Sequence, residues 1–192
     1  MGVNQLEVQF DLTHDCIRAC VYADYIARVQ PRGDAWPSIC DTLYADAILS
    51  WNHLFGTNSQ ESHWKKWVER APVPTGSRLK PFAASMIAQC LNTTLDDWAA
   101  YHAQLVDLRN NRIAHFDWKV AQNNLPNLTW AMHSAYLYRD WLLQLLQAYR
   151  DSGIALSIAD MSSRAMLEMF KTQIAEICGD ADPRTTKGSQ PA

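Results

Sequence analysis

The chain has few glycines and prolines and no long apolar run. Its 192 residues include 7 glycines and 8 prolines, which argues against a turn-rich all-β fold and against a glycine-rich phosphate loop. No apolar stretch approaches the roughly 20 residues that a membrane-spanning helix needs. The N-terminus lacks the basic and apolar segments of a signal peptide, so we expect a soluble, cytoplasmic protein without membrane association.

Cysteine, metal-ligand patterns and excess charge are also scarce. Five cysteines, an odd number without a Cys-x-x-Cys pair, fit neither a disulfide framework nor a zinc site. Cys16 and Cys20 would share a helix face, as two small core residues or, less favoured, as a redox pair. The histidines show no metal spacing, so we expect no metal and no cofactor. The net charge of −3 excludes a globally cationic surface but permits a local basic patch.

Apolar residues recur at helical spacing along almost the whole chain. The breaks between these patterns predict helices over residues 12–29, 38–55, 58–70, 81–91, 94–116, 127–150 and 159–177, with a loop over 117–126. Thr94, with Asp97 at the third helical position, predicts a helix cap. Asn58, with Glu61 three residues later, predicts another helix start.

These patterns define the expected architecture. With no alternating strand pattern, the class is all-α, an up-and-down helical bundle with additional short helices. We expect one domain over residues 1–179. Residues 180–192 are polar and aperiodic, and are expected to form a disordered tail.

The predicted helix over 94–116 carries two arginines on its apolar side. On a helical wheel centred on Trp98, the apolar sector holds Tyr101, His102, Leu105, Val106, Leu108, Ile113 and Phe116. Arg109 lies about 20° from the centre of this sector and Arg112 about 40°. His115 lies at its edge, three residues after Arg112. An unpaired buried charge is costly, so the two guanidinium groups need an explanation.

Two kinds of explanation are open. In the structural explanation, the helix dipole stabilises the two arginines near the C-terminus of the helix, or each arginine pairs with an acid of a neighbouring helix, such as Asp46 or Asp140. In the functional one, the stripe leaves the core and lines a cleft or a dimer interface, where arginine and histidine face an anionic ligand. Guanidinium groups suit phosphate oxygens, and a histidine exchanges protons near neutral pH. Such a pair suffices for metal-free RNA cleavage.

The run Arg109-Asn110-Asn111-Arg112-Ile113-Ala114-His115 resembles the signature of the HEPN superfamily, Arg-x4–6-His with a polar residue after the arginine. The segment over residues 47–56, AILSWNHLFG, resembles a helix-ending stretch of the AbiU2-like branch of that superfamily, which is linked to abortive phage infection. The similarity covers residues 10–150 in helix number and order. It implies an all-α bundle that often dimerises.

The resemblance also implies roles for individual residues. Many HEPN proteins are metal-independent endoribonucleases of defence or toxin–antitoxin systems, so Arg109 and His115 would be catalytic and Asn110 would orient them or the phosphate. Arg112 is outside the family pattern, and we expect it to bind phosphate or to pair with an acid. The motif residues Arg109 and His115 are separated by about 9 Å along a helix and 120° around it. A homodimer would ease this separation by bringing two motifs together.

A second cluster interleaves aromatic and basic residues. Trp64-Lys65-Lys66-Trp67 is explained most simply by a helix that buries both tryptophans and turns its lysines outward. If RNA binds, Lys65, Lys66 and Arg70 are candidate contacts. Lys119, after the motif, is a further one.

The sequence therefore leads to one functional hypothesis and one alternative. The first is a metal-independent endoribonuclease of a defence or toxin–antitoxin type, acting on RNA at a homodimer interface and controlled by an antitoxin or regulatory protein. The alternative is a catalytically inactive HEPN-like module that binds a protein or a nucleotide.

Overall fold

The computed structural model describes residues 3–113, 126–154 and 161–179. These residues form the helices α1 (Val3–Val29), α2 (Trp36–Phe55), α3 (Trp64–Arg70), α4 (Ala84–Cys90), α5 (Leu95–Leu108), the π-helical turn η1 (Arg109–Ile113), α6 (Thr129–Asp151) and α7 (Ser163–Ile177). No strand occurs within these three ranges, and the all-α class is confirmed there.

Several predicted boundaries change. α1 begins well before residue 12, because Leu6 and Phe10 extend its buried side. The predicted helix start at Asn58 is wrong: α3 begins at Trp64, and the imidazole of His63 caps it by accepting from the backbone N–H of Lys65. The tail over 180–192 and the predicted loop up to residue 125 lie outside the described residues.

The cap predicted for α5 is confirmed. The Thr94 hydroxyl oxygen accepts a hydrogen bond from the backbone N–H of Asp97 at 3.0 Å. The Thr94 hydroxyl in turn donates to the Asp97 carboxylate at 2.7 Å. The first of these bonds satisfies one backbone donor that the first helical turn leaves without a partner, and the second holds the Thr94 hydroxyl in place.

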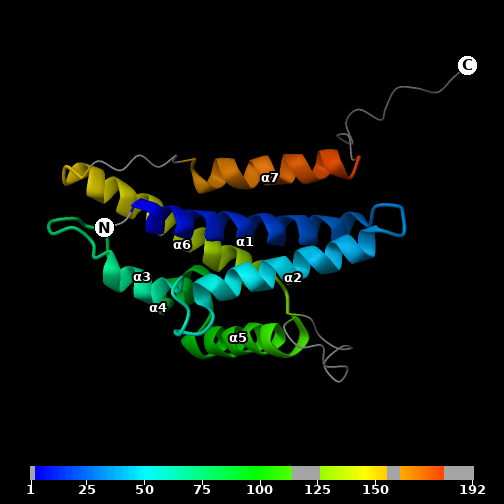
Figure 1. The fold of residues 1–192 in the computed structure, drawn as a ribbon, viewed down its shortest axis with the longest axis horizontal. Helices are drawn as coiled ribbons and strands as arrows, with labels where there is room; N and C mark the ends of the chain where they lie inside the picture. Colours follow the sequence, from blue (N-terminus) through cyan, green and yellow to red (C-terminus); the bar gives the residue numbers. More distant parts are fainter. Residues whose placement is uncertain (1–2, 114–125, 155–160, 180–192) are drawn as a thin grey trace, which may run out of the picture.

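The long helices lie in layers (Figure 1). α2 lies between α1 and α5, while α7 runs along α1 on the side away from α2, and α6 packs against α1, α2 and α7. The short helices α3 and α4 lie near the C-terminal end of α2. Of the helices in the described ranges, none is long and apolar enough to cross a bilayer.

The centre of the core is the C-terminal half of α2. Trp51 is fully buried, and its indole N–H donates to the hydroxyl of Ser134 on α6 at 3.0 Å. Its ring contacts Trp98 and Tyr101 of α5 edge-on. Trp51 therefore joins three helices, and it fixes α5 relative to α2 over the segment that precedes the Arg–His motif.

The two N-terminal cysteines belong to this core. Cys16 and Cys20 are buried free thiols. The Cys16 thiol donates weakly to the carbonyl of Ala47, and a hydrogen bond with Cys20, together with burial, raises the pKa of Cys16 well above its usual value. A raised pKa disfavours the reactive thiolate of Cys16, and both cysteines are small side chains buried in the core.

Candidate functional site

The Arg–His motif begins at a change in helix type. α5 is α-helical to Leu108, and the chain continues through Arg109–Ile113 as a π-helical turn, so the prediction of one regular helix over 94–116 is wrong from Arg109 onward. Residues 114–116 lie outside the described residues. π-helical turns are rare, and they are frequent at functional sites.

A side chain from α2 reaches this transition. Asn52 is 1% exposed, and its amide donates to the carbonyls of Ile48 at 2.9 Å and Leu105 at 3.3 Å. The Leu105 carbonyl also accepts from the backbone N–H of Arg109. A side-chain donor inserted into the backbone ladder is a known cause of helix distortion. We attribute the onset of η1 to this shared carbonyl.

Arg109 is partly buried beside α2 and has no acidic partner in the described part of the chain. Its Nε atom is buried and forms no hydrogen bond there. Neither predicted partner pairs with Arg109. Asp46 lies near Arg18, whose positive charge partly offsets the rise in the Asp46 pKa caused by burial. Asp140 lies beside Arg139. The ion-pair explanation of Arg109 is therefore not met within the described ranges.

Arg139 shows how the same fold accommodates a structural arginine. It is 5% exposed, one guanidinium N–H donates to the carbonyl of Met161 at 3.1 Å, and its guanidinium carbon lies 5.0 Å from the ring centre of Phe10. Burial lowers its pKa. The Nε atom of Arg139, like that of Arg109, is buried without a hydrogen bond. The two residues differ because Arg139 has a backbone acceptor and an aromatic face, and no such contact of Arg109 occurs among the described residues.

The remainder of the predicted catalytic set is only partly described. Asn110 is half-buried at the second position of η1. The neighbouring Asn111 donates from its side-chain amide to the carboxylate of Asp107 at 2.6 Å. The Arg112 side chain, His115 and Lys119 lie outside the described residues, so the approach of His115 to Arg109 stays a prediction.

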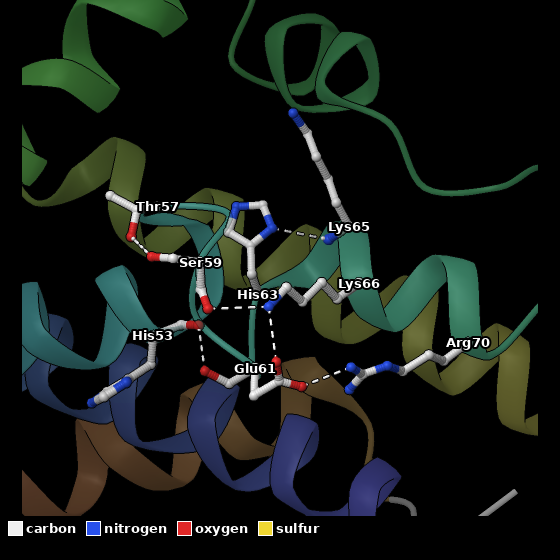
Figure 2. Close-up of polar contacts among 9 residues, drawn as sticks. His53, Thr57, Ser59, Glu61, His63, Lys65, Lys66 and Arg70 are labelled. Carbon is white, nitrogen blue, oxygen red and sulfur yellow. Dashed lines mark hydrogen bonds and ion pairs between the residues drawn. The ribbon is translucent and has the colours of Figure 1, made fainter.

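The predicted RNA contacts on α3 divide into two groups (Figure 2). Lys66 and Arg70 both pair with the carboxylate of Glu61, at 2.9 and 2.7 Å, and they hold the pKa of Glu61 at about 2. Lys65 points away from this cluster, with its ammonium 5.6 Å from the ring centre of Trp64. Trp64 and Trp67 are buried, as the amphipathic pattern predicts. Only Lys65 of these three cations lacks a carboxylate partner among the described residues.

Two histidines that sequence reasoning left without a role meet at the C-terminal end of α2. The His102 Nε2 atom lies 2.6 Å from the carbonyl oxygen of Phe55 and 3.1 Å from that of Gly56, so this nitrogen carries the proton and donates. His63 lines the same pocket, which has a volume of about 420 Å³. One signal was present in the sequence: His102 falls within the apolar sector of the wheel.

His63 is neutral at physiological pH. Its Nδ1 atom accepts from the Lys65 backbone N–H, and the side chain is 2% exposed. Burial is the largest of the effects that lower the pKa of His63 to about 4, and the nearby Lys65 and His102 add to it. The neutral ring serves as a helix cap and as a polar wall of the pocket, not as a cation.

The two sequence segments that carry the family resemblance are neighbours in space. Residues 47–56 form the end of α2, and this end packs against both α5 and η1. Gly56 is required there, because an added Cβ would lie 2.5 Å from the backbone oxygen of Asn52. The conformation of the Arg109 turn therefore depends on the end of α2.

Comparisons with models of protein families, with curated proteins and with solved structures found no match to this chain. Within the described ranges, no three His, Cys, Asp or Glu side chains gather in a way that could hold a metal ion.

Proposed function

We propose that this protein is a metal-independent endoribonuclease of the HEPN type, acting in defence or in a toxin–antitoxin pair, with Arg109 and His115 as its catalytic residues. One observation carries the proposal. Arg109 stands at the start of a π-helical turn with a buried, unpartnered Nε atom and without an acidic partner in the described ranges. A half-buried guanidinium group without a carboxylate beside it is available to a phosphate as its counterion.

The chemistry needs only side chains of the motif. The 2′-hydroxyl oxygen of a ribose attacks the adjacent phosphorus, and the bond from phosphorus to the 5′-oxygen of the next nucleotide breaks. The His115 imidazole takes the 2′-hydroxyl proton or gives a proton to the leaving 5′-oxygen, and water makes the other of these two transfers. The Arg109 guanidinium stabilises the charge that develops on the phosphorane. The products carry a 2′,3′-cyclic phosphate and a 5′-hydroxyl.

Dimerisation is part of the proposal. On a regular α-helix, Arg109 and His115 would be about 120° apart. The π-helical turn over Arg109–Ile113 changes this angle, and we propose that a second chain supplies the groups that one motif does not direct at the same phosphate. A two-fold partner places two motifs opposite one another, and each phosphate then meets groups from both chains. An antitoxin or regulatory protein could block this face.

The test is cleavage of an end-labelled, single-stranded RNA by the full chain in excess EDTA. We expect products with cyclic phosphate ends from the wild type, and a loss of at least about 100-fold in rate for His115→Ala and for Arg109→Ala. Sedimentation at micromolar concentration should give a dimer.

Two exposed residues provide matched controls: His133→Ala on α6 and Arg164→Ala on α7 remove the same side-chain types elsewhere and should retain activity. Overexpression should arrest growth for the wild type and for the control variants, but not for His115→Ala. Cleavage that persists in His115→Ala, or the absence of EDTA-resistant cleavage and of toxicity, would contradict the proposal. The second result favours the inactive interaction module.

A further inference from the structure

The pocket beside the C-terminal end of α2 has the size and the lining of a small-molecule site. Its volume of about 420 Å³ falls within the range of roughly 300–1,000 Å³ that is typical of ligand pockets. Its lining comes from the loop after α2 and from the starts of α3 and α4, with α5 closing it. The lining residues are Phe55, Gly56, Thr57, Asn58, His63, Trp64, Lys65, Ala84, Trp98 and His102.

The walls combine aromatic surface with neutral hydrogen-bonding groups. Trp64 and Trp98 contribute indole rings. His102 is half-buried, and its Nε2–H donates to two backbone carbonyls, which leaves Nδ1 as the ring nitrogen for a ligand. Asn58 is exposed and offers an amide with both donors and an acceptor. Such groups suit a planar ring with a polar edge.

The only charged residue that lines this pocket is a cation. Lys65 is exposed at the pocket and makes no ion pair within the described part of the chain. The next residue, Lys66, is held by Glu61 together with Arg70, on the side from which Lys65 points away (Figure 2). An unpaired ammonium at a pocket lined by no carboxylate favours a ligand with an anionic group.

From these features we infer that the pocket binds one nucleotide, with its base against the exposed edges of Trp64 and Trp98 and beside His102 and Asn58, and with its phosphate at Lys65. This inference rests on the proposed function, because that function makes RNA the source of the nucleotide. A free nucleoside monophosphate presents the same base and phosphate, and the experiment below distinguishes the two sources.

The position of the pocket fits a substrate subsite. His102 on α5 and Arg109 at the start of η1 are seven residues apart, which corresponds to about two α-helical turns, or about 10 Å along the axis of α5. Both residues lie against α2. An RNA strand with one nucleotide in the pocket therefore reaches Arg109 within a few nucleotides. The pocket would hold a residue that flanks the cleaved bond and would contribute to sequence preference.

The experiment measures binding without cleavage. The full chain is titrated with a 2′-O-methyl tetranucleotide, which lacks the attacking hydroxyl, and separately with each of the four nucleoside monophosphates. Tryptophan fluorescence and calorimetry report the Kd. We expect Lys65→Ala to raise the Kd about tenfold, because it removes one charge-assisted contact. Ala84→Leu, which fills the pocket at the start of α4, should raise it at least as much.

Lys171→Ala on α7 is the matched control, and its Kd should stay within about twofold of the wild-type value because Lys171 pairs with Glu168 and does not line the pocket. Binding of the tetranucleotide alone identifies RNA as the source, and saturable binding of a monophosphate identifies a free nucleotide. If neither probe binds, or if Lys171→Ala weakens binding as much as Lys65→Ala, the inference is overturned. Cleavage is measured separately. RNA cleavage without this binding pattern would support the proposed function and refute the nucleotide pocket. The binding pattern without cleavage would support the nucleotide pocket and refute the proposed function.

Discussion

Acidification should destabilise the fold through His63. The side chain is 2% exposed, its Nδ1 atom caps α3, and burial together with Lys65 and His102 lowers its pKa to about 4. In the unfolded chain the pKa is about 6.5. Above pH 6.5 both states hold a neutral ring, so His63 adds no pH dependence there. As the pH falls below 6.5, the unfolded chain binds a proton that the folded chain does not.

The size of the effect follows from these two values. Each pH unit between the unfolded and folded pKa costs about 1.4 kcal/mol of unfolding free energy. The loss is about 2 kcal/mol at pH 5 and reaches about 3 kcal/mol near pH 4, where the folded state also begins to bind the proton. Against a typical domain stability of 5–15 kcal/mol, this is a large fraction.

Urea unfolding across pH 7 to pH 4.5 tests the effect, with His63→Asn as the comparison. Asparagine is a good N-cap residue and keeps an acceptor for the Lys65 N–H, but it does not titrate. We expect the wild type to lose about 2 kcal/mol relative to the variant between pH 7 and pH 5. Parallel stability curves for the two proteins would show that His63 is protonated equally in both states and would refute the reasoning.

Two further predictions concern stability. Gly56→Ala should lower the unfolding free energy by about 1–3 kcal/mol in urea, because the new Cβ would lie 2.5 Å from the Asn52 backbone oxygen; unchanged stability would show that the end of α2 shifts freely. Thermal melts of Arg109→Ala and Arg139→Ala should differ: the first stays near wild type, while the second loses about 2 kcal/mol with the Met161 and Phe10 contacts. Equal losses would mean that Arg109 is structural.

Much of the fold could be predicted from local signals. Helical periodicity located every described helix, and the Thr94–Asp97 pair identified the cap of α5. The start of α3 was misplaced because Glu61, which fits a capping pattern with Asn58, instead pairs with Lys66 and Arg70 further along the chain. A capping pattern of four residues does not show whether its carboxylate forms an ion pair with a residue further along the chain.

The candidate site was less accessible to sequence reasoning. The wheel identified Arg109 as a charge on an apolar face, and the structure places it beside α2 with its Nε atom unpartnered. The wheel assumes 100° per residue, however, and the π-helical turn departs from this value because Asn52 approaches from another helix. The pocket forms because His63 and His102 come together at the end of α2 when the chain folds. The only sign of this in the sequence is that His102 is a polar residue in the apolar sector of the wheel.

The wide turn after Leu108 also bears on how this motif tolerates changes in length. A π-helical turn accommodates one residue more than the α-helical turn it replaces, so one residue can be removed there while the flanking helix keeps its course. Asn110 and Asn111 are identical neighbours, and loss of either leaves the same shortened chain. Four residues instead of five would then separate Arg109 from the histidine, which is still within the Arg-x4–6-His signature.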